Sequence, residues 1–458
     1  MPVATAIETD LKNLTTDLVK HAMARGASAA EAAVGEGSEF STLVRLGQVE
    51  TLKEAGSKSV GVRVYFGKRA ASAYSTDFSR EGLKQMLESA LSLAKATSED
   101  PYIGLPAAEQ LGSLAGDLDL YYDDVISLPA ERRIELARRA EQAALAADPR
   151  ITNSEGGSFD ASAGRKVLAN SLGFVGETQR SYSSISAVPI AAPADGQGAM
   201  QRDYWYSIAR SVSKLESPEE VGWKAAERTV RRLGAHKVPT ARVPIVFDQL
   251  AATSLLRQIL DAVNGDAVYR GASFLAGKLG EKALGSNINI IDDGTIPGGF
   301  GTSPFDGEGV PTRRTVVFEG GVLSSYLLNC YTARKLGLQT TGNAARGLAG
   351  MPGIGSGNFF VPRGNKSAKD IIGGVRDGLY VTEFLGFGVN LVTGDFSRGA
   401  SGLWIRNGEL AFPVEEITVA GNLREMFSNV SEIGSDLEFR GAVASPTLRI
   451  EGMTVAGE

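Results

Sequence analysis

Cysteine and histidine are both scarce in this chain of 458 residues, which contains one cysteine and two histidines. The single cysteine, Cys330, cannot form an intrachain disulfide, which excludes a disulfide-stapled secreted module and fits the cytosol. Its neighbours are apolar, so we expect a buried thiol that behaves as a small hydrophobic residue. His21 and His236 stand far apart, and neither has another histidine at metal-ligand spacing. A serine or cysteine hydrolase, which needs a histidine base beside its nucleophile, is therefore not expected.

Long apolar runs and an excess of positive charge are also missing. No run of about 18 apolar residues occurs, so no transmembrane helix is expected. The first residues include acidic side chains and no cationic segment before an apolar core, unlike a secretory signal peptide. A net charge of −6 argues against a broad basic surface for nucleic acid. These features predict a cytoplasmic protein that binds neither membranes nor nucleic acid.

Length and glycine are what the chain has in excess. At 458 residues it exceeds one typical core, and its 55 glycines indicate many tight turns. We predict an α+β protein of three domains. Residues 1–98 form an N-terminal antiparallel sheet with packed helices, and residues 99–236 form a middle domain of connector, helix, β-meander and helix. Residues 237–458 form a β-rich, barrel-like domain with a few helices.

Strict alternation of apolar residues over 59–66 is typical of a sheet with one buried face. Further strands are predicted at 29–35, 40–46, 49–54 and 69–75, with hairpin turns at 47–48 and 67–68. Helices are predicted at 5–25 and 79–95 around this sheet. In the middle domain, helices at 129–147 and 218–234 flank strand-like residues 150–215.

The third domain opens with a strand at 244–247 that leads into a helix. Asp248 is a plausible N-cap, and Asn264-Gly265 is a typical helix stop. Asn407-Gly408 predicts a hairpin turn. Strands are expected at 288–291, 314–318, 322–329, 359–362, 378–386, 403–406, 409–412 and 447–451, with a helix at 366–375 capped near Ser367.

Several segments of this third domain resemble the TldD/PmbA family. They are GASFLAGKLGEKA (271–283), DDGTIPGG (292–299), FDGEGVPTRRTVVFEGGVLSSYLLN (305–329), YTARKLGLQTTGNAAR (331–346) and PTLRIEGMTVAG (446–457). The N-terminal half matches more loosely, through GASAAEAAVGEG (26–37) and GVRVYFGKRAASAYSTD (61–77). The family pairs a zinc peptidase subunit with a related subunit that lacks the metal site.

The resemblance also places the peptidase's HExxxH motif on this chain, at residues 256–261. The first histidine position is Leu256, the glutamate position is Arg257 and the second histidine position is Asp261. A catalytic zinc needs about three protein ligands, and here only Asp261 could serve as one. Residues 430–445, where the family's cysteine ligand would fall, contain neither Cys nor His. The chain therefore looks like the PmbA/TldE-type subunit, without a metal or catalytic residue of its own.

The implied function is that of a non-catalytic subunit in a heterodimeric zinc protease, with zinc, HExxxH and the catalytic glutamate in a TldD-like partner. The family implies unfolded peptides as substrates, including peptide precursors and labile antitoxins. Alternatively, the chain is a stand-alone homodimer that binds peptides without cleaving them. Arg257 could hold a peptide carboxylate or form an exposed salt bridge.

Two further sets of residues have alternative interpretations. Asp292, Asp293, Asp306 and Glu308 could bind Ca²⁺ or Mg²⁺ or carry unrecognised carboxylate chemistry, or they could cap turns. Asn358, Phe359, Phe360 and Val361 could form a strand with a free edge, to which an extended peptide adds as a further strand. In the family this region borders the peptide channel between subunits; the alternative is an ordinary internal strand.

Overall fold

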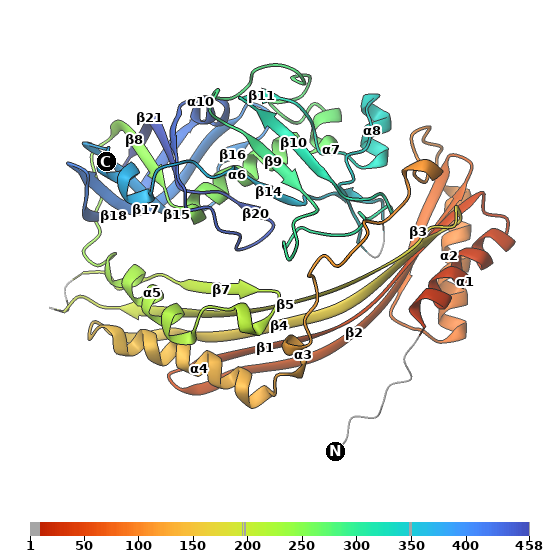
Figure 1. The fold of residues 1–458 in the computed structure, drawn as a ribbon, viewed down its shortest axis with the longest axis horizontal. Helices are drawn as coiled ribbons and strands as arrows, with labels where there is room; N and C mark the ends of the chain where they lie inside the picture. Colours follow the sequence, from red (N-terminus) through yellow and green to blue (C-terminus); the bar gives the residue numbers. More distant parts are fainter. Residues whose placement is uncertain (1–9, 195, 197, 348–349, 458) are drawn as a thin grey trace.

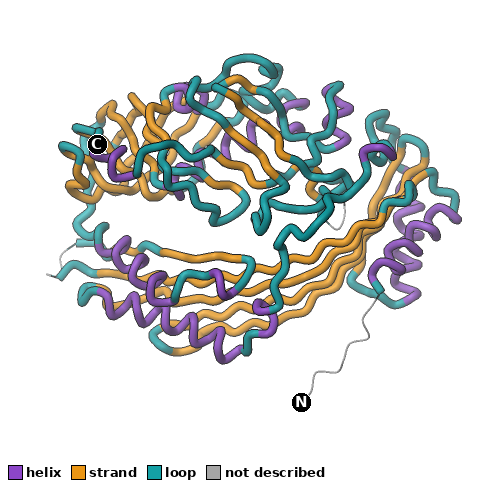
Figure 2. The backbone as a smooth tube through the Cα atoms, in the orientation of Figure 1, coloured by secondary structure: helices purple, strands orange, loops and turns teal. Residues whose placement is uncertain are grey.

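The computed structural model describes residues 10–194, 196, 198–347 and 350–457. A long, curved sheet lies beneath a second, β-rich body, and helices cover the outer side of that sheet (Figure 1). Figure 2 shows the strands of the sheet curving under the loops of the second body. The α+β class predicted from the sequence is confirmed. In the described residues, no helix has both the length and the apolar character that crossing a membrane requires.

The long sheet has the strand order β3-β2-β1-β4-β5-β6, with β7 also paired to β5. Its strands are β1 (Ala29–Arg45), β2 (Gln48–Phe66), β3 (Arg69–Ser75), β4 (Ile151–Asn170), β5 (Val175–Ala191), β6 (Gln201–Arg202) and β7 (Trp205–Ala209). Its helices are α1 (Leu11–Ala24), α2 (Arg80–Ala96), α3 (Asp124–Ser127), α4 (Ala130–Ala147) and α5 (Pro218–Val230). Short 3-10 turns, η1 (Ala108–Gln110) and η2 (Val212–Lys214), lie in the connections.

Where the sequence predicted four short strands near the start of the chain, the structure has two long strands. Residues 29–35 and 40–46 belong to β1, and residues 49–54 and 59–66 belong to β2. The prediction of breaks was wrong because the intervening glycines and polar residues continue the β1–β2 ladder, which shifts only between Leu43 and Val44. The turn between them is at Leu46-Gly47, one residue earlier than predicted. Strand β1 also pairs with β4, so residues from the first two predicted domains share one sheet.

The two faces of this sheet differ in chemistry. Val34, Val60 and Val62 lie on the convex face, where they pack with α1 and α2 in one apolar cluster. Phe40 and Phe159 lie further along the same face, against α4 and α5. Because successive side chains alternate between faces, the intervening residues of these strands lie on the concave face, which the β-rich body covers.

The β-rich body contains a closed five-stranded barrel. Its strands are β8 (Ala241–Phe247), β15 (Asp377–Leu385), β17 (Asp395–Arg406), β18 (Glu409–Asn422) and β21 (Leu448–Ala456). The barrel closes because β15 pairs with both β8 and β17. Strands β16 (Val389–Asn390) and β19 (Val430–Ile433) extend it. The barrel-like architecture predicted for this region is therefore confirmed.

A second sheet of the same body has the order β11-β10-β9-β14-β20. These strands are β9 (Ile290–Asp293), β10 (Arg314–Glu319), β11 (Val322–Leu323), β14 (Asn358–Phe360) and β20 (Val443–Ala444); β12 (Ala344–Ala345) pairs with β13 (Gly353–Ile354). The strand predicted over residues 322–329 is wrong after Leu323. The chain there leaves the sheet to reach Asn329, which caps helix α8 (Cys330–Leu336). Cys330 is buried, as expected.

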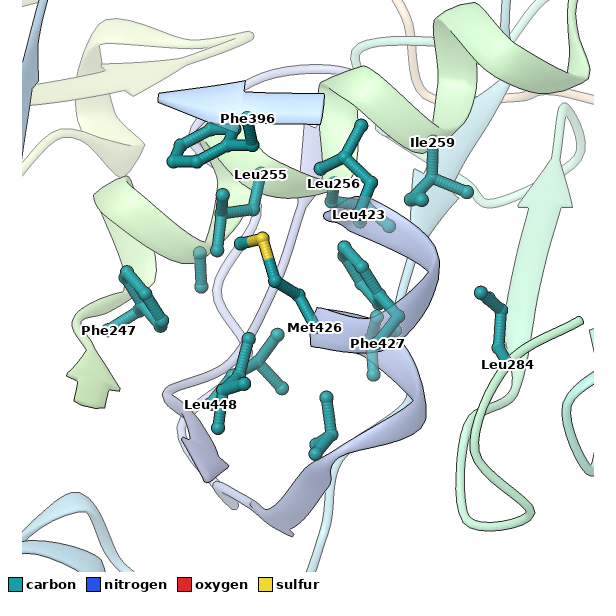
Figure 3. Close-up of a cluster of buried hydrophobic side chains, with 14 of the residues drawn as sticks. Phe247, Leu255, Leu256, Ile259, Leu284, Phe396, Leu423, Met426, Phe427 and Leu448 are labelled. Carbon is teal, nitrogen blue, oxygen red and sulfur yellow. The ribbon is translucent and has the colours of Figure 1, made fainter. Parts of the chain in front are cut away.

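Helix α6 (Gln249–Val263) anchors the core of the β-rich body. Asp248 caps it by accepting a hydrogen bond from the Ala251 amide at 2.8 Å, as predicted. Figure 3 shows its residues Leu255, Leu256 and Ile259 facing side chains of α10 (Leu423–Ser428) and the barrel.

The predicted helix stop needs one correction. Helix α6 ends before Asn264, but Gly265 does not adopt a left-handed conformation; it opens the next helix, α7 (Gly265–Tyr269). A Cβ at Gly265 would lie 2.5 Å from a methyl carbon of Leu328, so glycine is required there by close packing. Helix α9 (Ala368–Gly373) is capped by Ser367, as predicted.

Candidate functional site

A cavity of about 800 Å³ lies between the concave face of the long sheet and loops of the β-rich body. Strands β1, β2, β4, β5 and β7 contribute its floor. Residues within 292–313, 342–346 and 355–357, mostly in loops, contribute to its opposite wall. Beside the cavity the two bodies also make an apolar contact, where the rings of Phe174 and Phe305 have centroids 5.1 Å apart.

The floor of the cavity is bare because glycines occupy its centre. Gly37 of β1 and Gly164 of β4 stand directly opposite each other in the ladder. A Cβ at Gly37 would lie 3.0 Å from the Ala163 carbonyl oxygen, and a Cβ at Gly164 would lie 2.8 Å from that of Glu36. The strands can approach this closely only without those side chains, and their absence leaves room above the sheet.

Cations are concentrated in this cavity. Lys166, Arg180, Arg210 and Arg346 all line it. Arg210 is 6% exposed and donates to the carbonyl oxygens of Gly299 and Phe300, at 2.9 and 3.1 Å, so it ties the sheet to the opposite loop. Burial lowers the pKa of Arg210 to about 10, which leaves it charged at neutral pH.

Arg346 belongs to a buried group of charges at the end of the cavity. Its guanidinium lies 2.6 Å from one carboxylate oxygen of Glu31, and Arg63 lies 2.8 Å from the other. Tyr65 donates a hydrogen bond to the same carboxylate at 3.2 Å. Burial alone would raise the pKa of Glu31, but the charges of Arg346 and Arg63 lower it overall. This group connects β1 and β2 to the loop after β12.

The four carboxylates singled out from the sequence accept hydrogen bonds from backbone amides and side chains, both within their own segments and from residues 330–344. Asp293 accepts hydrogen bonds from the amide and hydroxyl of Thr295, at 2.9 and 2.7 Å. Asp306 accepts the backbone amides of Glu308, Val310 and Ala344, at 2.8 to 3.0 Å. These contacts match the interpretation that the carboxylates cap turns.

The other two carboxylates are similarly engaged. Glu308 accepts the Cys330 amide at 2.8 Å, and Asp292 accepts the Asn343 side-chain amide at 2.7 Å. Burial raises the pKa of Asp292 to about 6 and that of Glu308 to about 7. Within the described ranges, no three or more His, Cys, Asp or Glu side chains are grouped so that they could hold a metal ion.

The three residues aligned with the zinc motif do not all lie on one face of helix α6. Leu256 is fully buried in the barrel-side core, while Arg257 and Asp261 are exposed one turn apart. Arg257 lies near Tyr206 of β7: burial raises the pKa of this phenol, and the charges of Arg440 and Arg257 oppose the rise. An aliphatic core residue, a permanent cation and one carboxylate do not fit a zinc ion.

The expectation of a free edge at residues 358–361 is wrong. Strand β14 pairs with β9 on one side and with β20 on the other. Asn358, Phe359 and Val361 are fully buried, and the Asn358 side chain donates to the Asp293 carbonyl at 2.7 Å. The alternative interpretation, an ordinary internal strand, is the one that the structure confirms for β14. The closing strand, β20, is only two residues long and gives no signal in the sequence.

Sequence reasoning did not single out the cations of the cavity floor. Lys166 and Arg180 stand in the region interpreted only as strand-like with polar alternation. The alternation could have identified them. In a strand with polar residues on one face and apolar residues on the other, the polar residues mark the face that meets a water-filled space.

The chain thus combines a curved sheet, a closed barrel and a polar cavity between them. Family profiles match three parts of the chain: the PmbA/TldA metallopeptidase domain 1 at residues 30–94, the central domain at 123–233 and the C-terminal domain at 240–457. The chain belongs to the PmbA/TldD metallopeptidase family, as its sequence motifs implied.

Known relatives agree with this placement. Metalloprotease PmbA of Escherichia coli O157:H7 is 39% identical over 94% of this chain and 92% of its own length. A crystal structure from Bacteroides thetaiotaomicron, of a protein proposed to modulate DNA gyrase, has a TM-score of 0.91 at 29% identity; the match covers 99% of this chain and 100% of that one. TldE from Thermococcus kodakarensis has the same fold, with a TM-score of 0.87 at 22% identity over 96% of this chain and 99% of that one.

Proposed function

We propose that this chain is the non-catalytic subunit of a heterodimeric zinc protease and that its cavity holds part of an unfolded peptide. The observation that carries the proposal is the motif helix. Leu256 is committed to the core, and Arg257 is a cation where a zinc peptidase needs a general base. A TldD-like partner would supply the zinc, the HExxxH motif and the water-activating glutamate.

The cavity supports a role in holding peptides. Its floor is a curved sheet that is bare at Gly37 and Gly164 and has small polar residues such as Ser162 and Thr178 beside them. An extended chain lying there would meet polar groups and open space, with few side-chain pockets to select its sequence. Recognition of this kind suits unfolded peptides of varied sequence, such as peptide precursors and antitoxins.

A free strand edge supports the presence of a second subunit. Among the described residues, β3 covers only residues 60–66 of β2, so residues 48–59 pair with β1 on one side alone. This edge carries exposed Leu52 and Val49, at 54% and 42%. Long exposed edges of this kind are usually protected by another chain. We infer that the edge docks against the partner subunit.

A second candidate function uses the same edge. Two copies of this chain could pair through residues 48–59 and form a homodimer that binds peptides without cutting them. The two candidates differ in what the edge recognises, so the partner found in solution separates them. For either form we infer a cytoplasmic setting, because a single buried cysteine suits a reducing compartment.

The test is hydrolysis of an unfolded peptide by the purified chain, by an HExxxH-bearing relative from the same organism, and by their mixture. We expect activity that rises on mixing and is lost with a chelator. Leu52→Lys should weaken the complex in size-exclusion chromatography, while Leu172→Lys, at the exposed turn between β4 and β5, should not. Chelator-sensitive hydrolysis by this chain alone would overturn the proposal, and a homodimer that ignores the relative would favour the second candidate.

A further inference from the structure

Lys166 and Arg180 form a pair of cations on the floor of the cavity. In the ladder between β4 and β5, Lys166 stands opposite Thr178, and Gly164 stands opposite Arg180. The two cationic residues are therefore diagonal neighbours on the same concave face, at a spacing that long side chains can bridge. Both side chains line the cavity.

Arg313, which also lines the cavity, is exposed to solvent, and three other cations near the cavity have partners. Arg165 lies 2.7 Å from Glu36, Arg346 lies 2.6 Å from Glu31, and Arg210 donates to backbone carbonyls. Lys166 and Arg180 differ from them. Within the described residues, neither forms an ion pair with a carboxylate. Lys166 reaches only the Arg346 carbonyl oxygen, at 3.4 Å, and the buried Nε of Arg180 has no hydrogen-bond partner.

The acids in the same cavity do not neutralise this pair. Asp306 is engaged with backbone amides and Asp292 with Asn343. Two further acids line the cavity and have other partners: Glu36 lies 2.7 Å from Arg165, and Glu39 lies 3.7 Å from Lys53. In the part of the chain that the structure describes, none of these four acids forms an ion pair with Lys166 or Arg180.

Both side chains are half-buried, and two neighbouring cations that are partly withdrawn from water are stabilised when an anion joins them. Burial, together with the charges of Arg346 and Arg180, lowers the pKa of Lys166 to about 8, and burial lowers the pKa of Arg180. Both remain mostly protonated at pH 7. A carboxylate can accept hydrogen bonds from a guanidinium and an ammonium at once, and such charge-assisted bonds are short and strong.

We propose that Lys166 and Arg180 bind a carboxylate group of the peptide held in this cavity. The inference rests on the proposed function, since it assigns an anchoring contact to the same peptide. The carboxylate comes either from the C-terminus of the peptide or from an acidic side chain, and the two sources share the same contacts. An anchor at this point would position the rest of an extended peptide along the bare floor over Gly164 and Gly37.

The experiment measures the binding of ten-residue Gly/Ser/Ala peptides with a neutral fluorophore at the N-terminus to the full chain, by anisotropy. One peptide ends in a free carboxylate, one in an amide, and one in an amide with a single internal Asp. We expect the neutral amide to bind about tenfold more weakly than the free acid. Lys166→Met and Arg180→Gln combined should abolish the difference. Lys84→Met and Arg80→Gln, exposed on α2 behind the sheet, are the matched controls.

Each outcome has a defined meaning. If only the free acid binds well, the anchor takes a C-terminus; if the internal Asp restores affinity, it takes any peptide carboxylate. Equal affinity for the acid and the neutral amide in the wild-type chain would overturn the inference and leave the proposed function intact. If none of the peptides binds, the peptide-holding role fails and the inference with it. The wild-type comparison needs no variant, so it holds even if the double variant folds poorly.

Discussion

The buried charges around Glu31 give the sharpest prediction about how the two bodies are held together. The Glu31 side chain is 1% exposed, and those of Arg63 and Arg346 are 4% and 6% exposed. Glu31→Gln keeps the shape of the side chain but leaves two guanidiniums without their shared anion. Removing one partner of a buried ion pair typically costs about 3–5 kcal/mol. We expect a loss of that order in the free energy of unfolding at pH 7.

The pH dependence of this loss follows from the direction of the shift. Although burial opposes it, the two arginines lower the pKa of Glu31 below 4.5 in the folded protein. A lowered carboxyl pKa stabilises the folded state above the unfolded pKa, and that stability is lost as the pH falls through the folded pKa. The difference between wild type and Glu31→Gln should therefore be full at neutral pH and shrink in acid below about pH 4.5.

Urea unfolding followed by tryptophan fluorescence measures this difference. The matched control is Glu39→Gln, whose exposed partner Lys53 lies 3.7 Å away with both side chains 63% exposed. Exposed pairs contribute about 0–1 kcal/mol, so this variant should be nearly neutral. A loss below about 1 kcal/mol for Glu31→Gln, or a loss equal to that of the control, would refute the reasoning.

Three further predictions concern other parts of the molecule. As the pH rises from about 4 to 6, burial of Asp292 lowers the stability of the fold, because burial raises the pKa of this carboxyl from its ordinary value of 3.8 to about 6. Asp292→Asn should remove this fall and gain up to about 3 kcal/mol above pH 6, measured by unfolding across pH. Gly157→Ala should cost about 1–3 kcal/mol in thermal unfolding, since its Cβ would lie 2.2 Å from the Ala137 carbonyl of α4. Arg440→Gln should cost about 2 kcal/mol and shift tryptophan emission, because Arg440 donates to Glu216 at 3.0 Å and stacks 4.3 Å over the Trp205 ring.

Local signals in the sequence placed most helices and turns correctly. Asp248 and Ser367 cap helices because each side chain accepts a nearby backbone amide. Asn407 and Gly408 form a turn because both adopt positive φ, at 51° and 82°. The interactions that fix these caps and turns lie within a few residues of one another, so a short stretch of sequence is enough to predict them.

Features set by distant residues were not predictable in the same way. The interior position of β14 depends on β20, about 85 residues further along, which pairs through Phe359 and Phe360. The Glu31 group joins side chains from β1, β2 and residue 346, and no local pattern links them. The same holds for Lys166 and Arg180, whose proposed role depends on which loops cover the concave face.

The most direct test of the central claim is the zinc content of the purified chain, measured by elemental analysis after dialysis against zinc-containing buffer. We expect far less than one zinc per chain, and no change with Asp261→Ala, because Leu256 and Arg257 cannot act as ligands. One tightly held zinc per chain that is lost in Asp261→Ala would contradict it.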